Sequence, residues 1–299
     1  MAFFKRIGLF LLTNVLVIVT IGVVWSIVSH FLGLAGLNSQ IPFLMAFCAV
    51  WGMGGAFISL FMSKWMAKMF HGVKVIDPQT QDPQLRHLVT KVHEMSRRAQ
   101  ISKMPEVGVY ESVDINAFAT GPTKNKSLVA VSTGLLQRMN EKELEGVLAH
   151  EVAHIANGDM VTMTLIQGIV NAFAMFFSRI LANLVASNVD ERFREIARFA
   201  VIILGDIAFT LLGSIVVNYF SRKREFRADA GGAKYSSREN MIAALARLKS
   251  VYDLPIPPEE GQTATLMISN RDKGGISRLF MTHPPLDERI QVLQRGSRL

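Results

Sequence analysis

Two histidines four residues apart, His150 and His154, have the residue type and the spacing needed to bind a metal ion. They stand in the stretch LEGVLAHEVAHIANGDM, residues 144–160, and Glu151 follows the first histidine. Residues i and i+4 project from the same face of a helix, so both imidazoles can reach one ion. Imidazole ligands with one open coordination position are typical of catalytic zinc. Glu151, rotated by about 100° around the helix, can accept a proton from a metal-bound water.

The residues around the histidines predict a rigid helix with a defined start. Asn140 and Glu143 stand in the positions of a capping box, in which each side chain binds the other residue's backbone N–H. The apolar residues that can pack this helix against a core are Val147, Leu148, Val152 and Ile155. The alternative, two solvated histidines on a polar face, fits these apolar surroundings poorly.

A catalytic zinc usually needs a third protein ligand, and the stretch SRKREFRADAGGAKY offers Glu225 and Asp229. The two acids are four apart, hence on one helical face, and they follow the last of four apolar runs. The histidine pair precedes the third run, so a hairpin of runs three and four would make the two pairs neighbours. We expect Glu225 to bind zinc and Asp229 to accept the N–H of a ligating histidine. Alternatively, Glu225 only pairs with Arg222 or Arg224.

The composition predicts that this site belongs to a membrane protein. Half of the 299 residues are hydrophobic and 19% are charged, which is too apolar for an ordinary soluble enzyme. The formal net charge of +8 comes from basic residues that cluster beside the apolar runs. That placement follows the positive-inside rule, so we expect a lipid bilayer and no nucleic acid as partner. The single cysteine, Cys48, leaves no intrachain disulfide.

The first two apolar runs, residues 7–32 and 41–63, contain no Asp, Glu, Lys or Arg. Each exceeds the roughly 20 residues needed to cross a bilayer, so residues 1–75 are predicted to form a transmembrane hairpin. A cleaved signal peptide is the alternative for the first run, but its apolar part usually has only about 7–15 residues. Basic residues flank the hairpin at both ends, which predicts that both ends face the cytoplasm.

Residues 76–299 are predicted to form the catalytic domain. A second transmembrane hairpin, with spans at about 161–189 and 199–220, is expected to interrupt it. Because both runs contain polar residues, a long hairpin partly buried in protein is the alternative. Apolar spacing predicts a helix in residues 82–101, and alternation predicts short strands in PEVGVYES and LVAVS. The predicted fold is therefore a mainly α integral membrane protein with a small α+β domain.

Five stretches together resemble the HtpX family of bacterial membrane zinc metalloproteases: NAFATGP, VAVSTGLL, HEVAHIANGDMVTMTLIQG, SRKREFRADAGGAK and FMTHPPLDERI. The resemblance runs in order from the N-terminal hairpin to the C-terminus and covers nearly the whole chain. The resemblance implies a multi-pass protein of the bacterial inner membrane, with a zincin-type metalloprotease domain facing the cytoplasm. It also implies polypeptide substrates, above all misfolded or damaged membrane proteins in quality control, and a relationship to the CAAX prenyl proteases.

The resemblance implies roles for individual residues as well. The two histidines of the motif and Glu225 would bind one Zn²⁺ per chain, and Glu151 would be the catalytic base, in agreement with the pattern. The resemblance adds Asn116, beside the strand that binds substrate, and His283, near the scissile carbonyl. Neither residue stands out from the pattern alone, which reads Asn116 as a turn residue and His283 as a loop histidine.

A non-hydrolytic metal-binding membrane protein or a transporter is the rival interpretation. Polar residues within the third apolar run, Gln167, Asn171 and Arg179, are of the kind that transporters use. A transporter, however, has no need of a glutamate beside its histidine ligand, and this sequence lacks the symmetric halves of many carriers. A hydrolase is therefore the preferred interpretation.

Overall fold

The computed structural model describes residues 41–252 and 281–296 together with isolated residues between 19 and 30 and Leu279. The first apolar run and the proline-rich stretch after residue 252 lie outside the continuously described residues. The described residues fall into two compact units. One comprises the described part of Met1–Ser59 with Met163–Val217, and the other comprises the described part of Leu60–Thr162 with Asn218–Leu299.

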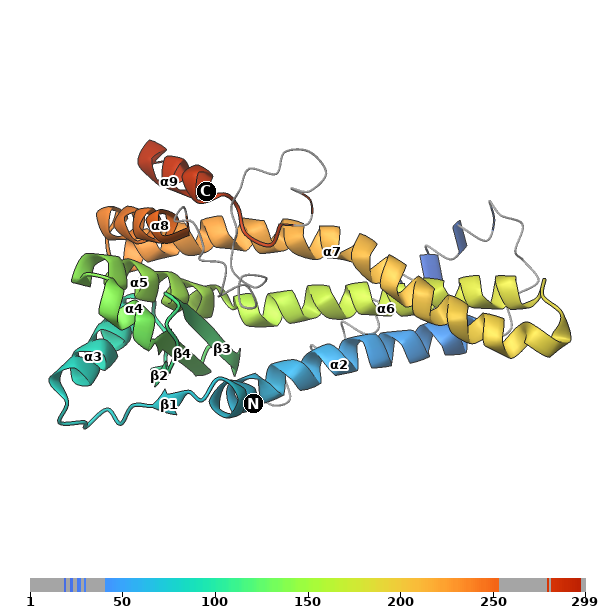
Figure 1. Cartoon of the computed structure of the whole chain (residues 1–299), viewed down its shortest axis with the longest axis horizontal. Coiled ribbons are helices and arrows are strands. Elements are labelled where there is room, and N and C mark those ends of the chain that lie inside the picture. Colours follow the sequence, from blue (N-terminus) through green and yellow to red (C-terminus); the bar gives the residue numbers. More distant parts are fainter. Residues whose placement is uncertain are drawn as a thin grey trace. The chain divides into compact units, whose positions relative to one another are not determined.

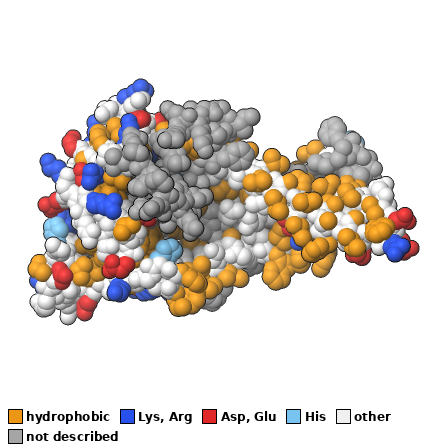
Figure 2. All heavy atoms as spheres, viewed as in Figure 1, with side chains coloured by type: hydrophobic (Ala, Val, Ile, Leu, Met, Phe, Trp, Pro, Cys, Tyr) orange, Lys and Arg blue, Asp and Glu red, His pale blue; other side chains and the backbone are white. Residues whose placement is uncertain are grey.

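Among the described residues, three helices are long and apolar enough to cross a membrane (Figure 1). They are α2 (Ile41–Phe70), α6 (Asp159–Ala186) and α7 (Arg194–Tyr235), the last preceded by the short 3₁₀ helix η2 (Glu191–Phe193). The second, third and fourth apolar runs lie on these helices, as the sequence predicts. Hydrophobic side chains cover much of their visible surface (Figure 2), which suits contact with lipid.

The first unit is held together by close packing and by pairing of its polar groups. A Cβ at Gly52 would lie 2.5 Å from the backbone nitrogen of Ala172, so α2 and α6 are nearly in backbone contact. Within the apolar helices, Arg179 Nη1 lies 3.6 Å from Asp206 Oδ1, and Ser178 donates a hydrogen bond to the same carboxylate. Charged groups in such surroundings are costly unless they are paired in this way.

The second unit contains a four-stranded sheet with the strand order β1-β2-β4-β3. The strands are β1 (Lys74–Val75), β2 (Glu106–Tyr110), β3 (Ala117–Thr123) and β4 (Lys126–Ser132). Strands β2 and β4 run parallel, whereas the β1–β2 and β3–β4 pairs are antiparallel. This order leaves β3 at one edge of the sheet.

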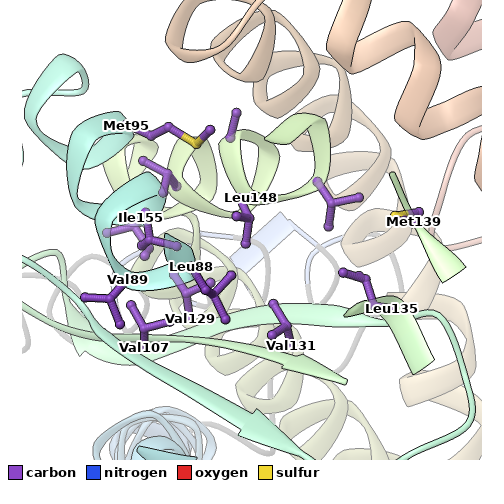
Figure 3. Close-up of a cluster of buried hydrophobic side chains, with 14 of the residues drawn as sticks. Leu88, Val89, Met95, Val107, Val129, Val131, Leu135, Met139, Leu148 and Ile155 are labelled. Carbon is purple, nitrogen blue, oxygen red and sulfur yellow. The ribbon is translucent and has the colours of Figure 1, made fainter. Parts of the chain in front are cut away.

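Helices cover both faces of this sheet. The remaining helices of the unit are α3 (Pro83–Arg98), α4 (Thr133–Arg138), α5 (Glu141–Asn157), α8 (Arg238–Tyr252) and α9 (Leu286–Arg295). Val129 and Val131 of β4 pack in one core with α3 and α5, which contribute Leu88 and Leu148 (Figure 3). The alternate β4 residues Leu128 and Ala130 share a second cluster with Ala67 from the end of α2. Because β4 is buried on both faces, its apolar run is continuous.

The structure confirms the helix predicted in residues 82–101, the two predicted strands and the capping box. In α5, Asn140 Oδ1 accepts from the Glu143 N–H at 3.1 Å, and Glu143 Oε2 accepts from the Asn140 N–H at 3.0 Å. Strand β3 was not predicted, because its sequence AFATGPT does not alternate. Gly121 there has φ +136°, at an irregularity in the β3–β4 register that only glycine accommodates easily.

Helix α8 crosses α5 at Gly146, where the two helices come very close. A Cβ at Gly146 would lie 2.3 Å from the carbonyl oxygen of Asn240 and 2.7 Å from Ala244 Cβ. Since backbone atoms cannot move aside as flexible side-chain ends can, the glycine sets the distance between the two helices.

We therefore expect Gly146→Ala to destabilise the second unit by about 1–3 kcal/mol, the usual cost of overpacking a core. The measurement is the thermal unfolding midpoint of the detergent-solubilised protein. Gly55→Ala on α2 is the matched control, because a Cβ there meets no described atom within 4 Å. An unchanged unfolding midpoint for Gly146→Ala would show that α8 can move away from α5 without loss of stability.

Candidate metal centre and catalytic site

The candidate site forms where α7 packs against α5. Its small residues permit this approach: a Cβ at Gly231 would lie 2.7 Å from Ala153 Cβ, and one at Gly232 would lie 3.2 Å from the backbone nitrogen of His150. The acidic face of α7, with Glu225 and Asp229, therefore reaches the histidine face of α5. Both acidic side chains are almost completely buried.

The three predicted metal ligands converge in the structure. The Nε2 atoms of His150 and His154 are 3.1 Å apart, and each is 3.5 Å from a carboxylate oxygen of Glu225. All three ligand atoms lie within 4.8 Å of one another. Two ligands held about 2.0–2.1 Å from zinc in a tetrahedron are about 3.3 Å apart, so the observed separations suit a single ion.

The carboxylates beside the two imidazole Nδ1 atoms support the same assignment. Nδ1 of His150 lies 3.0 Å from Asp229 Oδ1, and Nδ1 of His154 lies 2.7 Å from Asp159 Oδ2. If each Nδ1 carries its proton toward a carboxylate, each Nε2 directs a lone pair into the shared space. Glu225 Oε1 is buried there without a hydrogen-bond partner among the described residues. Facing lone pairs and a carboxylate repel one another unless a cation lies between them.

The electrostatics of the site also favour a positive charge at this place. Burial lowers the pKa of His150, but the neighbouring carboxylates of Asp229 and Glu225 outweigh it and raise this pKa to about 10. The acidic side chains therefore favour a positive charge beside His150. Because a metal ion competes with protons for imidazole ligands, metal affinity is expected to depend on pH.

Arg289 is a component of the site that the sequence pattern did not indicate. Its side chain is 5% exposed, and its Nε and Nη2 donate to the two oxygens of Asp229 at 2.8 and 2.6 Å. Its Nη1 lies 3.4 Å from Glu225 Oε2. A signal was present: on α9, Arg289 falls on the helical face of the buried residues Leu286 and Leu293, where an apolar residue is expected.

The structure places the other predicted site residues around this centre. His283 Nδ1 lies 3.2 Å from Glu225 Oε2, so this histidine joins the cluster. Glu151 follows His150 on α5 and is equally buried. Asn116 precedes β3, the strand that packs along α5. The backbone of Asn116 is held by Ser132, whose N–H donates to the Asn116 carbonyl oxygen at 2.9 Å and whose Oγ accepts from the Asn116 N–H at 3.1 Å.

Comparison with known proteins gives this geometry a family context. Residues 81–296 match peptidase family M48. The chain is 51% identical over 297 residues to Protease HtpX homolog of Bacillus licheniformis, covering 97% of this chain and 99% of the relative. It is 49% identical over 303 residues to Protease HtpX of Escherichia coli K12, covering 98% of this chain and 99% of the relative.

A solved structure shows a similar fold at low sequence identity. The crystal structure of S. mikatae Ste24p is similar with a TM-score of 0.57 at 17% identity, covering 95% of this chain and 66% of that one. The sequence matches extend over nearly the full chain and include the helices that carry the histidines and the acids. This protein thus belongs to peptidase family M48, as a membrane metalloprotease of the HtpX type.

Proposed function

We propose that the protein is a zinc-dependent endopeptidase. His150, His154 and Glu225 hold one Zn²⁺, and Glu151 is the catalytic base. The observation that carries this proposal is the convergence of two imidazole Nε2 atoms, 3.1 Å apart, with a buried carboxylate. Two nitrogens and one oxygen are a ligand set of catalytic zinc sites, which keep a fourth position open for water or substrate.

The chain's own residues supply the remaining chemistry. Zinc, when bound, lowers the pKa of water and polarises a carbonyl. The Glu151 carboxylate accepts the proton of the attacking water and passes it to the leaving amine. His283, beside Glu225, donates a hydrogen bond to the oxyanion that develops on the scissile carbonyl. An extended peptide can bind along the edge strand β3, next to Asn116, through main-chain hydrogen bonds.

The arrangement of polar residues in α6 favours this proposal over a transporter. Gln167 donates a hydrogen bond to Asn171 at 2.9 Å, and Arg179 lies beside Asp206. These residues, which could have lined a transport path, pair with one another. The buried carboxylates and histidines that could bind a ligand instead gather on α5 and α7, in the unit that contains the sheet.

The proposal includes a cellular setting. Residues 1–75 would form a first membrane hairpin, and the domain of residues 76–299 would be interrupted by a second. Basic residues that follow the apolar runs, such as Lys64, Lys68 and Arg222, favour an inner-membrane protein whose active site faces the cytoplasm. Misfolded or damaged membrane proteins would be the natural substrates, as the resemblance implies.

The decisive experiment is hydrolysis of casein by the detergent-solubilised protein. Wild-type protein should cleave casein, lose activity with a chelator and regain it with zinc. Glu151→Gln should keep its zinc but lose activity by orders of magnitude, because the base is removed while the ligands remain. Near-normal turnover by this variant would contradict the assigned base. Activity that survives the chelator would contradict the metal mechanism altogether.

The third ligand can be tested by metal content. Glu225→Ala should lower zinc occupancy as well as activity, since two histidines alone would remain. Asp229→Ala should be milder, because loss of a partner of a ligand typically costs about 10–100-fold in affinity or activity. Metal analysis of both purified variants decides the matter. Full occupancy in Glu225→Ala would mean that the third ligand is another residue.

A further inference from the structure

Asp159 is a buried carboxylate behind the candidate metal centre to which the sequence pattern did not point. Its Oδ2 lies 2.7 Å from His154 Nδ1, and its Oδ1 accepts a hydrogen bond from Arg227 Nη2 at 2.9 Å. Only 1% of the residue is exposed. Both carboxylate oxygens are therefore engaged, one by a histidine of the α5 motif and one by an arginine of α7.

A buried carboxylate is costly unless its surroundings compensate for the loss of water. Asp159 is the first residue of α6, where the helix dipole favours a negative charge. Arg227 supplies a counter-charge, although its side chain is 57% exposed. These partners hold the carboxylate in a fixed place directly behind the His154 ring.

A carboxylate and an arginine also lie beside the other histidine, although His150 Nδ1 makes no hydrogen bond to the described residues there. Asp229 lies 3.0 Å from His150 Nδ1, and Arg289 donates two hydrogen bonds to Asp229. Each histidine thus has a carboxylate at Nδ1, and each carboxylate has an arginine. Both sets use α5 and α7, but Asp159 belongs to α6 and Arg289 to α9, so the repetition does not follow from a single sequence motif.

We infer that Asp159 is a positioning residue for the metal site: it orients the His154 ring, keeps the proton on Nδ1 and directs the Nε2 lone pair toward the ion, while Arg227 fixes the carboxylate. This inference rests on the proposed zinc site. A carboxylate that accepts the N–H of a ligating histidine also makes the opposite nitrogen a stronger donor. Loss of Asp159 should therefore weaken metal binding even though Asp159 does not touch the metal.

The test measures the zinc dissociation constant of the full chain in detergent, by competition with a chromophoric chelator. All variants carry Glu151→Gln, so that self-cleavage does not interfere. Asp159→Asn keeps an acceptor for the His154 N–H but removes the charge, and Asp159→Ala removes both. Asp82→Asn is the matched control, because Asp82 also begins a helix as its N-cap and its oxygen accepts from Gln84 N and Leu85 N, as asparagine can.

We expect zinc binding about 10-fold weaker in Asp159→Asn and about 100-fold weaker in Asp159→Ala. Arg227→Gln should have a smaller effect, and Asp82→Asn none. Cobalt bound in place of zinc should show shifted visible absorption bands in the Asp159 variants, because the His154 ring is no longer oriented. A merely structural role would lower the thermal stability of the metal-free protein but leave zinc affinity and the cobalt spectrum unchanged.

Glu225→Ala, measured alongside these variants, distinguishes failure of the proposed zinc site from failure of the role inferred for Asp159. If Glu225→Ala loses zinc while both Asp159 variants bind it with the dissociation constant of the parent, the role of Asp159 is refuted and the zinc site stands. If the parent itself binds no zinc, the proposed function fails, and the inference about Asp159 fails with it.

Discussion

The close contact between α5 and α7 is the constraint on which the candidate site depends. All three proposed ligands come from these two helices. Gly231 and Gly232 remove the Cβ atoms that would keep α7 away from Ala153 and His150. Protein interiors are packed too tightly to absorb an added methyl group without a shift. The glycines thus fix the separation of Glu225 from the histidines, and through it the size of the space they enclose.

The buried carboxylates around this contact have two different roles. Asp159 and Asp229 are each engaged by a histidine and an arginine, so their negative charge is balanced locally. Glu225 has Arg289 at 3.4 Å but keeps one buried oxygen without a hydrogen bond. Arg224 Nε also lies 3.5 Å from that oxygen, but without a hydrogen bond. Since a buried oxygen without a hydrogen bond is unfavourable, the site gains from a metal ion at that oxygen. Asp159 and Asp229 position the ligands, and Glu225, with one oxygen that accepts no hydrogen bond from the described part of the chain, is the acid suited to bind a metal ion.

The parts of this architecture that could be predicted from the sequence are those with a local pattern. The capping box at Asn140, the i, i+4 spacing and the period-two valines of β2 and β4 each reflect residues near one another in the chain. Strand β3 escaped prediction because Gly121 and Pro122 usually mark turns. In this structure Gly121 instead lies at the irregularity in the β3–β4 register, which depends on the neighbouring strand β4. Arg289 was not predicted as a site residue because its partner Asp229 lies 60 residues away. A pattern of neighbouring residues cannot indicate such a distant pairing.

Asp159 is an example of a contact that the topology of the chain can predict although the local sequence pattern cannot. The expectation that Glu225 approaches the histidines came from assuming that two apolar runs form a hairpin, whose ends must then be neighbours. The same assumption applies to any residue at those ends, and Asp159 and Arg227 stand there: Asp159 begins α6, and Arg227 follows Glu225 on α7. Their hydrogen bond joins residues 68 apart in sequence. A buried acid at the start of one helix and an arginine near the end of the next are thus a pairing that hairpin topology makes predictable in principle, even where neither residue belongs to a recognisable motif.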